Sequence, residues 1–267
     1  MKLSTKVLLP VTGIVVAVII IAGLFILNGI EDGFLQDATR VLQLTRDQAD
    51  TAIQRTQRTL FEAVAREALQ NGVVRDALAG RNTPFLSNHL RELGLRHGFE
   101  YLIVTDARGT VIARGHNDRM GDSLAGRHAV RRALGGEAQY GVSTGGGDGF
   151  YLVLTWPVRT AAGAVGGTLS LGIDLGKNSR FVDNLKALVS AEFTVFKGDT
   201  RVMTTLVGDN GVRRVGTKMD NPAVLRTVLD QGGQFIAENR LFGKRYLTVY
   251  WPITGDNGKR IGMWFIG

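Results

Sequence analysis

The stretch Tyr151-Leu-Val-Leu-Thr-Trp156-Pro157-Val158 returns 95 residues later as Tyr246-Leu-Thr-Val-Tyr-Trp251-Pro252-Ile253. The same offset joins Gly121 to Gly216, Arg131 to Arg226, Leu134 to Leu229, Gly167 to Gly262 and Gly172 to Gly267. Chance does not hold one register over about fifty residues, and a fixed period is the sequence sign of a repeated structural unit. The sequence therefore predicts an internal duplication.

Each copy has the same predicted order of elements. An apolar strand, a polar turn and a returning strand are followed by a short helix and an antiparallel hairpin. The opening strands are expected at 101–105 and 111–113 in one copy and at 192–196 and 201–203 in the other, with short helices at 127–134 and 222–229. The hairpins turn at Ala162-Gly163 and at Asp256-Asn257-Gly258, where Asn-Gly suits positive backbone angles. With helices ahead of the copies at 84–97 and 178–190, we predict two tandem α+β lobes with antiparallel sheets, over 84–175 and 176–267.

A long helix is expected before the lobes. Residues 32–70 contain no proline and only one glycine, Gly33, and they carry an intermittent apolar stripe. At 1.5 Å per residue such a helix would reach about 60 Å, enough to run alongside a whole domain. We therefore predict a stalk helix in the segment 31–80, interrupted near its end at Asn71-Gly72 and Gly80.

Residues 8–28 form the most apolar tract of the chain. The run from Leu8 to Leu27 carries no charge and has about the 20 residues that cross a bilayer core. Lys2 and Lys6 precede it, while Glu31 and Asp32 follow, so the positive-inside rule leaves residues 1–7 in the cytoplasm. A cleaved signal peptide is the alternative, but its apolar region spans only about 7–15 residues. We expect a membrane anchor of the inner membrane, with residues 31–267 periplasmic or otherwise extracytoplasmic.

Composition narrows the function classes. The chain has 267 residues, a formal net charge of +8 and no cysteine, which removes disulfides, thiolate metal sites and cysteine nucleophiles. Its arginines are scattered rather than gathered in one run, so solvated faces are favoured over nucleic-acid binding.

The first copy carries the residues that suggest a family. Val111-Ile-Ala-Arg114-Gly-His116-Asn117 leads to Gly121-Asp122-Ser123-Leu124. With a membrane helix, a stalk helix and two PAS-like lobes, nearly the whole chain resembles the double Cache sensor regions of bacterial methyl-accepting chemotaxis receptors, of the Cache 3 and Cache 2 fusion type. The resemblance implies a ligand in the first, membrane-distal lobe. It also implies a second membrane helix and a signalling part after Gly267, so we expect the chain to be a fragment of a longer receptor.

The expected ligand site lies between the sheet of the first lobe and its loops and helix. The candidate polar contacts are Arg114, His116, Arg119, Asp122, Ser123 and Arg127, and the candidate apolar wall is Tyr140, Tyr151 or Trp156. A guanidinium can hold a carboxylate by two parallel hydrogen bonds and imidazole can add a donor, so an organic acid or similar anion is favoured. In the competing interpretation Arg114 pairs with Asp118 or Asp122 to fix the loop, and Trp156 and Trp251 are core residues. Amino-acid sensors of the wider family carry an Arg-x-Trp tract that is missing here, which disfavours a free amino acid.

The sequence contains no motif that is typical of an enzyme active site. The four histidines, His89, His97, His116 and His128, form neither His-x-x-x-His nor Glu-x-x-His, so no metal is expected. Gly145-Gly-Gly-Asp-Gly149 matches no phosphate-binding loop and is better explained as a hairpin turn, and Ser123 lacks a Gly-x-Ser-x-Gly elbow. We expect no enzyme activity and no cofactor.

The sequence thus favours the ligand-sensing region of a transmembrane chemoreceptor, dimeric through its stalk. Histidine kinases and diguanylate cyclases carry similar sensors, and their sensor regions remain an alternative. A membrane-anchored solute-binding protein is another.

Overall fold

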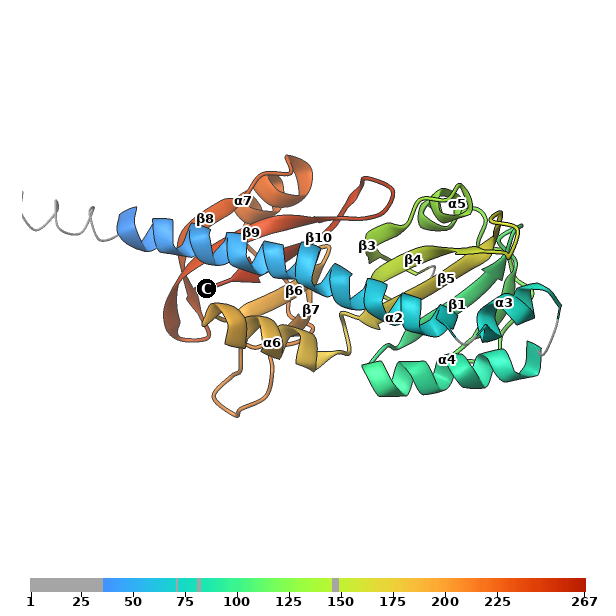
Figure 1. The fold of residues 1–267 in the computed structure, drawn as a ribbon. Helices are drawn as coiled ribbons and strands as arrows, with labels where there is room; N and C mark the ends of the chain where they lie inside the picture. Colours follow the sequence, from blue (N-terminus) through green and yellow to red (C-terminus); the bar gives the residue numbers. More distant parts are fainter. Residues whose placement is uncertain (1–35, 71, 81–82, 146–148) are drawn as a thin grey trace, which may run out of the picture. The chain divides into compact units, whose positions relative to one another are not determined.

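The computed structural model describes residues 36–70, 72–80, 83–145 and 149–267 (Figure 1). The membrane span expected at residues 8–28 lies outside these ranges. Within them, no helix combines the length and the hydropathy that crossing a membrane requires. The chain divides into two compact units, residues 1–44 and Thr45–Gly267. In the first unit, residues 36–44 are helical.

The second unit begins with helical residues that precede both lobes. Residues 45–51 are helical, a π-helical segment η1 follows at Ala52–Gln57, and α2 spans Arg58–Gln70. Gly72 then adopts a positive φ of 78°, a conformation that only glycine reaches at little cost. Helix α3 follows and spans Val73–Leu78. The segment 31–80 expected to form the stalk is thus interrupted at Gly72, one of the predicted interruptions, and α3 is a separate helix after it.

The first lobe is a five-stranded antiparallel sheet with the strand order β2-β1-β5-β4-β3. Its elements are α4 Thr83–His97, β1 Tyr101–Asp106, β2 Val111–Arg114, α5 His128–Leu134, β3 Gln139–Ser143, β4 Tyr151–Arg159 and β5 Val165–Asp174. Helix α5 packs on one face of the sheet, and α2 and α4 pack on the other (Figure 1).

The second lobe repeats this arrangement in the order β7-β6-β10-β9-β8. Its elements are α6 Ser179–Val189, β6 Phe193–Lys197, β7 Thr200–Thr204, α7 Pro222–Leu225, the π-helical η2 Arg226–Asp230, β8 Phe235–Leu241, β9 Lys244–Thr254 and β10 Arg260–Ile266. The two orders are identical position by position, so the predicted duplication and the α+β class with two antiparallel sheets are confirmed.

Strand alternation divides the side chains of the first lobe between two cores. On the α5 face, Val130 of that helix packs with Tyr101, Ile103 and Val153 of the strands. On the opposite face, Phe61 of α2 makes edge-to-face contacts with Phe99 and Tyr140, at ring-centroid distances of 4.7 and 5.6 Å. The sheet is thus buried on both sides, which suits its nearly continuous apolar strands.

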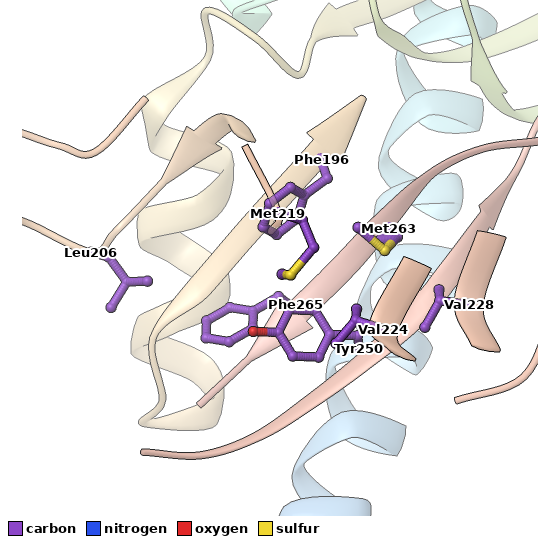
Figure 2. Close-up of a cluster of buried hydrophobic side chains, with 8 residues drawn as sticks. All are labelled: Phe196, Leu206, Met219, Val224, Val228, Tyr250, Met263 and Phe265. Carbon is purple, nitrogen blue, oxygen red and sulfur yellow. The ribbon is translucent and has the colours of Figure 1, made fainter. Parts of the chain in front are cut away.

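The second lobe has a comparable core under α7 and η2. Figure 2 shows the Tyr250 and Phe265 rings side by side, with Val224 and Val228 of the helical segment nearby. Their ring centroids are 5.0 Å apart. Met219 comes from the loop ahead of α7 and closes this core against Phe196 (Figure 2).

The helical segment 45–57 is bonded to a strand of each lobe. The hydroxyl of Tyr140 donates to the Ile53 carbonyl oxygen over 2.7 Å, within η1. In the second lobe, Nε1 of Trp251 donates to Oδ1 of Asp50 over 3.3 Å, and the Arg46 guanidinium lies 5.4 Å from the Trp251 ring centroid. Both lobes therefore have a polar link to the same stretch of helix.

Candidate functional site

A small cavity lies between α5 and the sheet of the first lobe. It has a volume of about 50 Å³ and is lined by Tyr101, Arg127, Ala129, Val130, Gln139, Tyr140, Gly141, Ser143, Gly145, Val153, Thr155, Ser170 and Asp256. Such a volume holds a few water molecules, whereas sites for small ligands span about 300–1,000 Å³. A ligand would have to displace groups that now fill the site.

Arg127 is the cation of this cavity. It is the N-cap residue of α5, with extended backbone angles (φ −78°, ψ 134°) that end the preceding loop. Its Nη2 donates to the Gly145 carbonyl oxygen across the cavity. That bond is to a neutral acceptor, so an incoming carboxylate would offer Arg127 a stronger, charge-assisted partner. Arg131, one helical turn later, donates instead to the Gly126 carbonyl at 3.1 Å and is exposed.

Tyr101 lines the cavity beside Arg127, and Tyr151 packs against the Tyr101 ring. The rings of Tyr101 and Tyr151 lie 4.9 Å apart, and burial raises the pKa of both hydroxyls, which therefore remain neutral donors at pH 7. The turn between β3 and β4 lies against the Tyr151 ring. A Cβ on Gly149 would lie 2.0 Å from Cε2 of that ring, so only glycine permits this approach. The expected wall residue Tyr151 is thus fixed in place by its own hairpin turn.

Arg114 is occupied by a partner within the protein. Its side chain is buried, with 6% of its surface exposed, and its two terminal nitrogens donate to both carboxylate oxygens of Asp122 over 2.8 and 2.9 Å. It also donates to the Arg119 carbonyl oxygen. The sequence left open whether Arg114 binds a ligand or pairs with Asp118 or Asp122 to fix the loop, and the structure shows the pair with Asp122. Asp118 instead pairs with Arg91 over 3.5 Å. Arg119 and Asp122 therefore frame the loop, and neither lines the cavity.

Removing Arg114 is expected to destabilise the first lobe. The hydrogen bonds from Arg114 hold the pKa of Asp122 at about 2, below its usual range. Arg114→Met leaves that carboxylate without its partner, and we expect a loss of about 2 kcal/mol at pH 7, discounted because Asp122 is partly exposed. Denaturant unfolding measures the loss, with exposed Arg108→Met as the control.

The same pair predicts a pH dependence with a definite sign. The pKa of Asp122 is lower in the folded than in the unfolded state, so its contribution is present above about pH 4 and disappears as the pH falls towards 2. The stability gap between wild type and Arg114→Met should therefore close over that range. A gap that stays constant from pH 6 to about pH 2.5 would contradict this account of the pair.

His116 and Ser123 have local partners and do not line the cavity. The imidazole stacks on the Tyr101 ring at 5.4 Å, and its Nδ1 accepts from the Leu102 amide over 3.4 Å. Burial, aided by the positive charge of Arg114, lowers the pKa of His116, so it is neutral at pH 7 and only Nε2 can donate. His116 instead lines a larger hollow of about 740 Å³ bordered by residues of α4 and α6. The Ser123 hydroxyl accepts from the Ala125 amide at 3.3 Å and shapes a turn.

The side chains of Tyr140 and Trp156 lie on the same face of the sheet, the one away from α5. Tyr140 borders the cavity only from strand β3, and its hydroxyl is bonded to Ile53 on the other face; burial raises the pKa of this hydroxyl. Trp156 alternates with Tyr151, Val153 and Thr155 along β4 and so lies on the face away from α5. It is half-buried there and does not line the cavity, while Trp251 is a buried core residue.

Of the predicted site residues, Arg127 and Tyr140 border the cavity. Tyr151 is beside it, because its ring packs on Tyr101, which lines the cavity. The polar cavity residues that sequence reasoning missed are Gln139, Ser143, Thr155 and Ser170. Thr155 and Ser170 bond to each other over 3.1 Å. Counting alternate residues from Tyr151 along β4 leads to Val153 and Thr155, so strand parity was the signal that could have found part of this wall. In the described residues, no group of acidic or histidine side chains is arranged to hold a metal ion.

Comparisons with known proteins agree with this two-lobed architecture. Two models of the family described as Single cache domain 3 match the chain, at residues 44–186 and 173–267. The sensor domain of the V. cholerae histidine kinase DctB has a similar fold, with a TM-score of 0.53 and 13% identity over 88% of this chain and 97% of that one. The ligand-binding domain of the Campylobacter jejuni chemoreceptor Tlp3, solved with 4-methylisoleucine, has a TM-score of 0.51 and 12% identity over 88% and 90%. No curated protein sequence matches the chain.

Proposed function

Because the chain belongs to the Single cache domain 3 family and holds two such lobes, we propose that it is the extracytoplasmic sensing region of a transmembrane chemoreceptor. In this proposal residues 8–28 anchor it in the inner membrane with the N-terminus cytoplasmic, and a homodimer forms through the helix that precedes the lobes. The ligand is a small organic acid bound behind α5. The signalling part would lie beyond Gly267, as it would if the same sensor served a histidine kinase or a diguanylate cyclase.

The hydrogen bond from Tyr140 to Ile53 is the observation that supports the sensing proposal. Tyr140 borders the cavity from strand β3, while its side chain lies on the opposite face of the sheet and donates its hydroxyl to the Ile53 carbonyl oxygen in the helix that leads towards the N-terminus. The acceptor lies in a π-helical segment, a rare form that is frequent at functional sites inside helices. A ligand that shifts Tyr140 therefore acts on the helix directly. Such a ligand must bind one arrangement of this contact better than the other.

The chemistry of the cavity favours a carboxylate. Arg127 supplies the charge, Tyr101 a neutral hydroxyl, and Val130 and Val153 an apolar floor. The carboxylate would replace the Gly145 carbonyl as the acceptor for Arg127, and α5 would have to move outward to make room for the carbon skeleton. An uncharged molecule of the same shape would gain much less from Arg127 than the acid does.

Calorimetric titration of the purified chain with a panel of C2–C6 organic acids tests the site. At least one acid should bind, and Arg127→Met should weaken it by about 10- to 100-fold because a charge-assisted pair is lost. Arg131→Met is the matched control, since that arginine lies on the same helix but does not line the cavity. If the acid binds equally well to Arg127→Met, the ligand is not held behind α5.

A further inference from the structure

The second lobe buries an arginine that has no acidic partner. Arg201 in β7 is only 4% exposed. Its Nη1 donates to the Thr217 hydroxyl, while its Nε is buried without any hydrogen-bond partner. Over the part of the chain that the structure describes, Arg201 forms no ion pair with a carboxylate. A buried guanidinium left in this state costs free energy that a bound anion would recover.

The duplication shows how unusual this position is. In the first lobe the Val111 amide donates to the Asp122 carbonyl oxygen, and the Val111 carbonyl accepts from Gly121. In the second lobe Arg201 makes the same two backbone bonds, to Thr217 and from Gly216. Arg201 therefore occupies the place of a core valine. The counterpart of Thr217 in the first lobe is Asp122, whose carboxylate neutralises the buried Arg114 of that lobe.

Two aromatic rings hold the Arg201 guanidinium without neutralising it. Its central carbon lies 4.9 Å from the Phe196 ring centroid and 5.5 Å from that of Phe242. Phe242 has a positive φ of 49°, which is rare and strained for a bulky side chain. The turn between β8 and β9 thus keeps a strained conformation that places an aromatic ring over Arg201, and also over Arg214 at 5.1 Å.

A cavity of ligand size adjoins this arginine. It has a volume of about 380 Å³ and is lined by Arg201, Thr217, Lys218, Met219, Asp220, Asn221, Asn239, Arg240, Leu241, Phe242 and Tyr250. Lys218 is already paired with Asp199 over 2.9 Å, and the exposed Asp220 makes no ion pair with Arg201. Met219, Leu241, Phe242 and Tyr250 give one side of the cavity an apolar surface. Burial lowers the pKa of Arg201, but a guanidinium remains charged at pH 7.

We propose that this cavity is a second ligand site, which binds a small monocarboxylate with an apolar body and pairs its carboxylate with Arg201. The ligand takes the role that Asp122 has for Arg114 in the first lobe, while its carbon skeleton lies against Phe242 and Tyr250. Carboxylate binding to a desolvated guanidinium is strong because the charge-assisted bonds form away from water. This site is independent of the cavity behind α5, and either can exist without the other.

Titration of the 267-residue chain in detergent with benzoate, and with benzamide as its neutral isostere, tests the proposal. Benzoate should bind at least about tenfold more tightly than benzamide, because only the acid pairs with Arg201. Arg201→Met should remove that difference. Arg226→Met, an exposed arginine of the same lobe outside the cavity, should retain it. If the wild type binds benzoate and benzamide equally well, or binds neither, the proposal is overturned without any measurement on a variant.

Thermal unfolding separates a ligand role from a structural one. Methionine in place of a buried, unpaired charge should leave the melting temperature of the free protein unchanged or raise it, and benzoate should no longer increase it. If Arg201→Met instead lowers the melting temperature by many degrees while the preference for benzoate over benzamide persists, Arg201 is a packing residue and the proposal fails. Loss of benzoate binding in Arg127→Met alone would assign the acid to the first lobe and would also overturn it.

Discussion

Alanine at Gly167 is expected to destabilise the first lobe by about 3–5 kcal/mol, enough to unfold a domain of ordinary stability. A Cβ added to this glycine would lie 2.0 Å from the Thr105 carbonyl oxygen of the neighbouring strand β1, and 2.8 Å from a methyl of Leu78. The first obstacle is backbone in a paired strand, so the sheet itself would have to open. Chemical denaturation of Gly167→Ala measures the loss.

Its counterpart Gly262 should behave alike in the second lobe. There a Cβ would lie 2.0 Å from the Phe196 carbonyl oxygen, so the same close approach occurs 95 residues later. Gly141→Ala is the matched control, because this glycine lies in β3 of the same sheet as Gly167, with no atom within 4 Å of an added Cβ. We expect the control to lie within about 1 kcal/mol of the wild type. Equal stabilities for Gly167→Ala and Gly141→Ala would contradict the strand spacing described above.

The second large effect is expected from Tyr140→Phe, which should separate ligand binding from its transmission. The substitution keeps the ring that contacts Phe61 on the α2 face of the sheet but removes the hydroxyl bonded to Ile53. Binding of an organic acid should change by less than about threefold, whereas the response of the helix to that acid should disappear. The free protein should lose about 1–2 kcal/mol, since a partly buried carbonyl oxygen is left unsatisfied.

Gln139→Ala provides the comparison for Tyr140→Phe. Gln139 also lines the cavity, but its amide donates only to the neighbouring Ala138 carbonyl oxygen over 3.1 Å. Among the described residues the Gln139 side chain makes no hydrogen bond to the helix, so its removal should leave the helix response in place. If both variants lose the response together, the response does not depend specifically on the bond from Tyr140 to Ile53.

The duplication made the fold predictable from the sequence. Element order, the helices at 84–97 and 178–190 and the closing hairpins follow from local patterns that occur twice, and the observed α4 and α6 lie at Thr83–His97 and Ser179–Val189. Repetition of Gly167 and Gly262 at one offset was part of the signal. Its physical reason, a carbonyl oxygen close to each, is visible only when the strands are paired.

The site was less predictable because it depends on pairing across loops. Arg114 and Asp122 are eight residues apart, and nothing in their spacing decides between an internal pair and a ligand contact. Arg201 was missed for a different reason. The offset from Val111 to Arg201 is 90 residues, not the 95 that joins Gly121 to Gly216, because the loop after β7 is five residues longer. A search at the single offset of 95 therefore does not align the buried arginine with its valine counterpart.

Hydrogen exchange of the wild-type chain with and without a bound organic acid tests the central claim most directly. Binding behind α5 should slow exchange in α5 and β3 and should also change exchange at residues 50–57, where Tyr140 meets the helix. An acid that alters α5 and β3 but leaves residues 50–57 unchanged, or that alters only the second lobe, would contradict the account of a first-lobe sensor coupled to this helix.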